Sequence, residues 1–127
     1  MKALALVFLG GGIGASLRHL LGGAAQAFSR SATFPWGTFA VNVSGCFAIG
    51  LLAGLAEERG VPSGNVRTFL FVGVLGGYTT FSSFGNETIS LLRGGEAFAA
   101  AANAGGQLVL GLLAVALGRA AARLLWR

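Results

Sequence analysis

The chain has 127 residues, of which 54% are hydrophobic and 10% are charged, and its mean hydropathy is +0.75. Soluble domains carry about 25% charged residues, so this composition excludes an ordinary soluble fold and indicates a membrane protein. The formal net charge is +5, but the basic residues are spread along the chain rather than clustered, which argues against nucleic acid as a partner. The single cysteine, Cys46, excludes an intramolecular disulfide.

Four apolar stretches predict four transmembrane helices. We place them at approximately 3–27, 38–56, 66–92 and 96–125, within a single transmembrane domain that covers residues 1–127. Each approaches the ~20 residues that a helix needs to cross the ~30 Å hydrocarbon core. The basic residues divide six to three between the two ends of such a bundle, which favours both termini on the cytoplasmic side.

The first predicted helix carries two misleading patterns. Its start imitates a cleavable signal peptide, but glycines dilute the apolar run and Arg18 and His19 interrupt it, so we expect no cleavage. Residues 10–15 match a dinucleotide-binding fingerprint, yet no carboxylate follows about 20 residues on to hold a ribose. Gly10 and Gly14 lie four apart on one face, which predicts close helix packing. Arg18 either lies at a pore mouth or reaches the lipid headgroups.

The second predicted helix carries a polar and small stripe. Its members recur at four-residue steps and so share one face: Thr38, Asn42, Cys46 and Gly50. The amide of Asn42 in mid-membrane is costly unless it finds a partner. Judged from this helix by itself, an interhelical hydrogen bond is the favoured role of the amide. The alternative is that its NH₂ offers donors to a passing anion.

The third predicted helix is interrupted by the sequence GGYTTFSSF at residues 76–84. Glycines and hydroxyl residues in an apolar span predict a broken helix. Non-helical backbone at membrane depth is tolerated only where it is buried in protein or lines a polar cavity. Such a turn exposes carbonyls that suit Na⁺, and amides and hydroxyls that suit an anion. Phe81 and Phe84 would share a helix face. Their rings either pack as ordinary apolar side chains or turn their partly positive edges towards an anion. We expect Glu87 to be solvated or helix-capping.

The fourth predicted helix places Asn103 and Gln107 four residues apart, with Gly111 continuing the same face. Two amides on one stripe are hard to explain as lipid-facing. We therefore expect this face to look into the bundle or a water-filled vestibule.

Three segments together resemble the Fluc (CrcB-type) fluoride channels. They are residues 10–18 (GGGIGASLR), 37–50 (GTFAVNVSGCFAIG) and 73–84 (GVLGGYTTFSSF), and the similarity covers essentially the whole chain. The resemblance implies an all-α membrane protein, four transmembrane helices with a broken third helix, that pairs with a second copy as an antiparallel dual-topology homodimer. It further implies two fluoride pores, a central structural Na⁺, passive export of fluoride across the cell (inner) membrane, and no enzymatic activity.

The resemblance also assigns roles to single residues. The pore-lining and polar-track positions of the family correspond to Asn42, Phe81, Ser82, Ser83 and Phe84. Arg18 matches a basic position near one vestibule, and the backbone carbonyls of Gly76 and Thr79 match those that hold the sodium ion. We add Thr38, Asn103 and Gln107 to the predicted fluoride pore, although related channels commonly carry Tyr and then Ser at the last two positions.

Two other classes of function are open at this point. A small proton-driven exporter of cationic drugs would need a carboxylate inside the first helix, and that helix has none. A structural subunit whose glycines merely pack against larger partners would leave the polar stripes of the last three helices unexplained. We therefore prefer the channel that the resemblance implies, whose partners would be fluoride, a second copy of the chain and the lipid bilayer.

Overall fold

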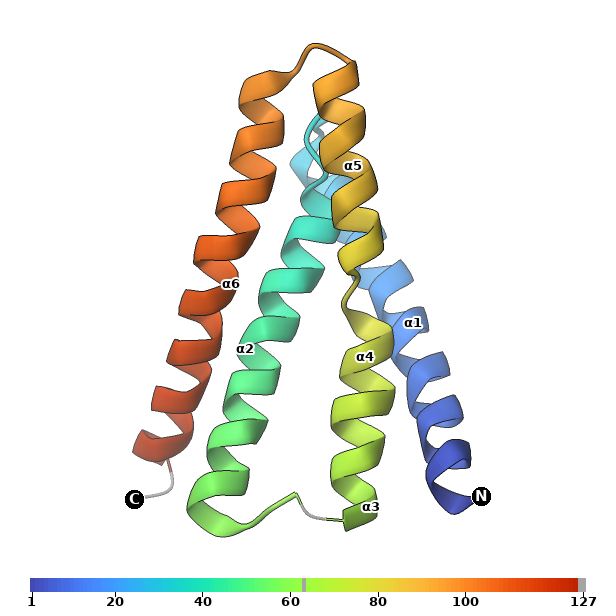
Figure 1. Ribbon diagram of the computed structural model, residues 1–127, viewed down its shortest axis with the longest axis vertical. Helices are drawn as coiled ribbons and strands as arrows, with labels where there is room; N and C mark the ends of the chain where they lie inside the picture. Colours follow the sequence, from blue (N-terminus) through green and yellow to red (C-terminus); the bar gives the residue numbers. More distant parts are fainter. Residues whose placement is uncertain (63, 126–127) are drawn as a thin grey trace.

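The computed structural model describes residues 1–62 and 64–125. Every regular element in this part of the chain is a helix (Figure 1). The elements in chain order are α1 (Lys2–Ser29), α2 (Trp36–Arg59), α3 (Gly64–Arg67), the π-helix η1 (Thr68–Leu75), α4 (Gly76–Tyr78), α5 (Phe81–Arg93) and α6 (Ala97–Leu125). α1 begins and α6 ends at the same end of the bundle, where α2 also connects to α3 (Figure 1). The all-α prediction is therefore confirmed.

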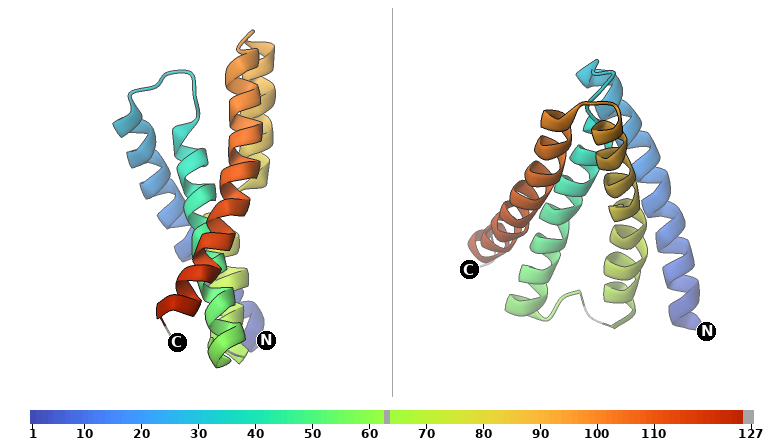
Figure 2. Two further views of the ribbon diagram at one scale, coloured as in Figure 1. Left: turned by 90° about the vertical axis from the view of Figure 1, so that its left-hand side faces the viewer. Right: turned by 45° about the horizontal axis from the view of Figure 1, so that its top comes forward.

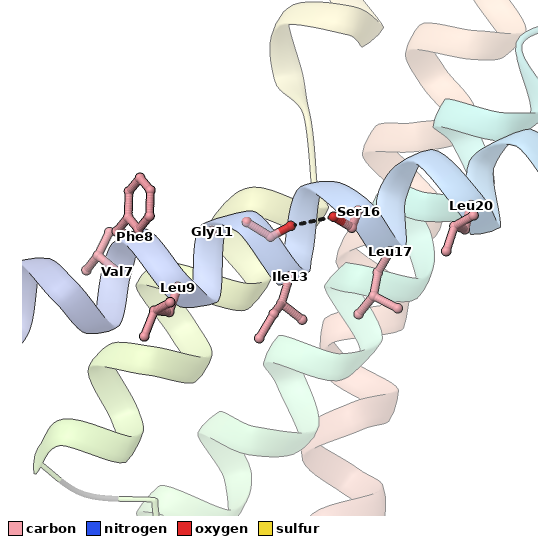
Figure 3. A pocket seen from close by; sticks show the side chains of 9 residues that line it. Val7, Phe8, Leu9, Gly11, Ile13, Ser16, Leu17 and Leu20 are labelled. Atoms are coloured by element: carbon pink, nitrogen blue, oxygen red, sulfur yellow. Dashed lines mark hydrogen bonds between the residues drawn. The ribbon is translucent and has the colours of Figure 1, made fainter.

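Among the described residues, three helices are long and apolar enough to cross a membrane, namely α1, α2 and α6. Figure 3 shows one face of α1 with its apolar side chains, among which Phe8, Ile13 and Leu17 are exposed in the single chain. The polar side chain of this face, Ser16, donates its hydroxyl to the carbonyl of Gly12 at 2.8 Å. A face whose one hydroxyl is satisfied within its own helix is suited to contact with lipid.

The segment predicted as a third helix at 66–92 is divided into several elements. η1 forms eight residues of π-helix, which the sequence analysis did not predict. After α4, Thr79 (φ −85°, ψ 158°) and Thr80 (φ −149°, ψ 110°) are extended, and α5 then begins. The extended residues lie just beyond Gly76 and Gly77, which stay helical, because β-branched threonines favour extended backbone more than a helix interior does.

Threonine also starts the helix that follows. The side chain of Thr80 accepts a hydrogen bond from the backbone N–H of Ser83 at 3.2 Å and so caps α5.

Glycines allow the helices to pack closely. α1 lies against η1, and a Cβ at Gly10 would come within 2.8 Å of the carbonyl oxygen of Phe69. A Cβ at Gly14 would collide with the carbonyl of Val74. The glycine face predicted for the first helix is therefore confirmed, since both positions admit only a hydrogen atom. α2 packs along α6 through glycines in the same way, with Gly50 against the backbone of Val115.

The helices diverge towards one end of the molecule. The α1–α2 and α5–α6 pairs separate at the end that holds their connecting loops, and the chain comes together near mid-height (Figure 2). The loop after α1 is fastened by Gln26, whose side-chain oxygen accepts from the N–H of Gly37 at 3.0 Å while its NH₂ donates to the carbonyl of Ser31 at 2.7 Å. At the other end of α2, Glu57 pairs with Arg119 of α6 at 2.9 Å.

Gly14→Ala tests the α1–η1 contact. The new methyl group meets backbone rather than a flexible side chain, so we expect a loss of about 1–3 kcal/mol of stability from overpacking. Thermal unfolding of the detergent-solubilised protein measures it. Gly12→Ala is the matched control on the same helix, because nothing lies within 4 Å of a Cβ there. Equal melting temperatures for the two variants would contradict the packing.

Candidate functional site

Both backbone groups of the extended residue Thr80 are hydrogen-bonded to one side chain. Asn42 of α2 accepts from the N–H of Thr80 through Oδ1 at 2.8 Å and donates from Nδ2 to the carbonyl of Thr80 at 3.0 Å. An amide supplies one acceptor and two donor hydrogens, so it can pair with a peptide unit as a neighbouring strand would. The interhelical hydrogen bond expected for Asn42 is confirmed, and its contact with an anion stays a prediction.

The break leaves two carbonyls without their helical donors. In a continuous helix the carbonyl of Gly76 would accept from the N–H of Thr80, and the carbonyl of Thr79 from that of Ser83. The N–H of Thr80 is instead bonded to Asn42, and the N–H of Ser83 is bonded to the hydroxyl of Thr80. These are the two carbonyls that the sequence analysis assigned to a cation. Arg18 Nη1 lies 3.5 Å from the oxygen of Thr79, which is a long hydrogen bond.

The amides of α6 continue the network that begins at Asn42. Asn42 Nδ2 donates to Gln107 Oε1 at 2.7 Å, Gln107 Nε2 to Asn103 Oδ1 at 2.9 Å, and Asn103 Nδ2 to the hydroxyl of Thr88 at 2.9 Å. Asn103 is fully buried, so the expectation that it faces the bundle is confirmed. Thr88 was missed, although it lies four residues after Phe84 and therefore shares its helix face.

Two open grooves meet at the break, and Thr80 lines both of them. The first, which we name the arginine groove, has a volume of about 480 Å³ and includes Arg18, Thr38, Ser83 and Glu87. The second, the phenylalanine groove, has a volume of about 700 Å³ and includes Asn42, Gly76, Thr79, Phe81, Phe84 and Gln107. The predicted site residues are thus divided between two faces of the break. Ser82 is exposed, 3.3 Å from the hydroxyl of Thr80, and Asn103 lies behind Gln107.

The two phenylalanines lie together at the start of α5. Their ring centroids are 5.3 Å apart and the ring planes are tilted by 54°. The side chain of Phe81 is 83% exposed, whereas Phe84 is half-buried. The ring of Phe81 therefore stands beside the non-helical backbone, where the described residues leave most of it uncovered.

Glu87 has a partner that the sequence analysis did not foresee. Its Oε1 accepts from the hydroxyl of Thr38 at 2.6 Å, which joins α5 to α2. Its Oε2 is buried without a hydrogen-bond partner among the described residues. The expectation of a solvated or helix-capping carboxylate is therefore wrong, because Oε1 bonds Thr38 and Oε2 is buried, although the residue as a whole is half-buried and lines the arginine groove.

The fold and the site define a small helical membrane protein in which polar side chains and carbonyls without their helical donors gather where a helix is interrupted. Residues 5–119 match the model of the CrcB-like protein family, Camphor Resistance (CrcB). The chain belongs to this family and is a multi-pass membrane protein.

Curated relatives cover nearly the full length. A fluoride-specific ion channel FluC of Methylobacillus flagellatus is 47% identical over 93% of this chain and 92% of its own. One from a strain of Thermus thermophilus is 51% identical, with 93% of each chain covered. Another, from Paramagnetospirillum magneticum, is 46% identical over the whole of both chains.

Replacing the side chain that closes the break should destabilise the fold. Asn42→Ala leaves the N–H of Thr80 without a partner and removes one donor from its carbonyl, and a buried unpaired group costs about 1–3 kcal/mol. We expect a lower melting temperature and faster hydrogen exchange at the amide of Thr80. Ser16→Ala is the control, because the exposed hydroxyl of Ser16 donates only within its own helix, to the carbonyl of Gly12. An unchanged exchange rate in Asn42→Ala would show that Asn42 does not hold the break.

Proposed function

We propose that the protein is a fluoride-selective ion channel through which fluoride leaves the cytoplasm passively, across the inner membrane of a bacterial-type cell. It is a channel and not an enzyme. The observation that carries the proposal is the extended pair Thr79–Thr80, which lies between two grooves lined by hydroxyls, amides and phenyl rings. The names of the relatives, each a fluoride-specific ion channel, support the choice of ion.

Fluoride is small and strongly hydrated, so a pore must replace its water with hydrogen-bond donors before the ion enters. The residues that we assign to this task are Arg18, Thr38, Asn42, Ser82, Ser83, Asn103 and Gln107. Phe81 and Phe84 supply apolar walls whose ring edges carry partial positive charge. Together they favour a small anion and disfavour cations and larger ions.

A second copy of the chain completes the site. The phenylalanine groove is open, and it is lined by Gly76 and Thr79, whose carbonyls lack their helical donors, and by the exposed ring of Phe81. Lipid offers no hydrogen bonds, so polar backbone at membrane depth must be buried in protein or line a polar cavity. We propose that an antiparallel copy covers this groove in a dual-topology homodimer with two pores.

The same carbonyls fit a sodium ion at the interface of the two copies. Hard cations prefer oxygen ligands, and a twofold axis at the break would bring together the carbonyls of Gly76 and Thr79 from each copy. A bound Na⁺ would neutralise these partial negative charges and leave a positive field that favours anions nearby. In each chain, Asn42 and the Thr80 hydroxyl prepare the site, because they withdraw the N–H groups that would otherwise occupy these carbonyls.

Fluoride efflux from liposomes tests the proposal directly. We expect the purified protein to release fluoride but not chloride, as followed with ion-selective electrodes. Phe81→Ile removes the ring beside the break and should lower the fluoride rate by ~10-fold or more, equivalent to ~1.4 kcal/mol of barrier. Phe98→Ile is the control, because Phe98 is similarly exposed, at 88%, but lines neither groove. Chloride release at a rate similar to that of fluoride would refute the assignment.

Sodium removal tests the proposed interface ion. Long dialysis into sodium-free buffer should lower dimer stability and activity slowly, and added Na⁺ should restore both. Gly76→Val should reproduce the loss in sodium, because within one chain a Cβ at Gly76 meets only the carbonyl of Phe71, at 3.8 Å. A defect there reports on the ion or the second copy. Gly85→Val is the control, since its Cβ would meet nothing within 4 Å. Indifference to sodium would remove the ion from the proposal.

A further inference from the structure

The polar side chains between α2, α5 and α6 form one continuous series of hydrogen bonds, which we name the amide ladder. It consists of Asn42, Gln107, Asn103 and Thr88, with adjacent partners 2.7–2.9 Å apart. It starts at a backbone donor, the N–H of Thr80, and ends at a backbone acceptor, the carbonyl of Phe84, to which the hydroxyl of Thr88 donates at 2.8 Å.

The direction of the ladder follows from its two ends. The N–H of Thr80 can only donate, so Asn42 must turn its oxygen towards Thr80 and its nitrogen towards Gln107. Gln107 must then accept with Oε1 and donate with Nε2 to Asn103, which in turn donates to Thr88. Thr88 can accept this bond because its own hydrogen goes to the carbonyl of Phe84. Each amide therefore has one orientation that leaves no donor facing a donor.

This orientation decides which donor is free. Asn42 Nδ2 uses both hydrogens, on Thr80 and Gln107. Gln107 Nε2 and Asn103 Nδ2 each use one hydrogen, on Asn103 and on Thr88, and the second hydrogen of each has no acceptor among the described residues. Gln107 lines the phenylalanine groove with Phe81 and Phe84, whereas Asn103 is fully buried behind it. The free N–H of Gln107 is thus available on the groove side.

We propose that Asn103 and Thr88 are positioning residues that hold the Gln107 amide so that its second N–H donates to fluoride in the phenylalanine groove. The inference rests on the proposed function and refines it. Asn103 leaves the set of residues that donate to the ion, as does Asn42, whose amide hydrogens are both used, and Thr88 enters the site as the anchor of the ladder. Without the hydroxyl of Thr88, Asn103 Nδ2 is buried without an acceptor and turns away, so Gln107 loses the bond that orients it.

The test uses variants of the full-length protein in the liposome assay. Thr88→Val keeps the shape of the side chain but removes the hydroxyl, and it should lower fluoride efflux about fivefold, as expected for the loss of one neutral hydrogen bond. Thr88→Ser should restore a rate near that of the unmodified chain. Ser90→Ala is the control, because Ser90 also donates to its own helix but lies outside the ladder. In a Gln107→Leu background, Thr88→Val should have no further effect.

Three results would overturn the inference. Thr88→Val could conduct normally, Thr88→Ser could be equally impaired, or Thr88→Val could slow the Gln107→Leu variant by the same factor. The last two would show that packing, rather than orientation of Gln107, explains the effect. Size-exclusion chromatography of each variant checks that assembly is unchanged.

A second measurement does not depend on conduction. In ¹⁵N-labelled protein, Thr88→Val should shift the side-chain NH₂ resonances of Asn103 and Gln107, while Thr88→Ser and Ser90→Ala leave them in place. Unshifted resonances would refute the ladder even if fluoride flows. If the unmodified chain carries no fluoride, the proposed function fails, and these resonances still decide whether Thr88 orients the two amides.

Discussion

The structure depends on one constraint, which is that a peptide unit outside a helix must keep its hydrogen bonds in an apolar environment. The chain meets it at Thr80 with a side chain from another helix, since Asn42 accepts from the N–H of that residue and donates to its carbonyl. The contact fixes α2 against the start of α5. It also diverts an N–H from Gly76, so the same substitution of partners that stabilises the fold creates an unpaired carbonyl beside the phenylalanine groove.

Local sequence patterns predicted the parts of the fold that depend mainly on residues close together in the chain. Long apolar runs gave the helices, and the spacing of Gly10 and Gly14 gave the face that packs against η1. The pattern also indicated that Asn103 is turned inward, because an uncharged amide in a transmembrane segment has few alternatives. These inferences need only helical periodicity and the cost of exposing a polar group to lipid.

Features that depend on contacts between distant segments were not predictable in the same way. The π-helix η1 is one such feature, because its sequence TFLFVGVL has the apolar character of an ordinary helix. Glu87 is another, since its partner Thr38 lies 49 residues away. For Thr88 the periodicity was visible, but its importance comes only from the position of Asn103 on α6. A polar residue is assigned correctly only when the element that faces it is known.

The placement of the chain ends has a consequence for how the proposed antiparallel dimer could be encoded in one polypeptide. α1 begins and α6 ends at the same end of the bundle (Figure 1). A direct tandem fusion would therefore give both halves the same orientation in the bilayer. Joining two halves of opposite orientation requires a connector that itself crosses the membrane, at least ~20 further apolar residues. Gene duplication alone would preserve the fold of each half but not the inverted arrangement.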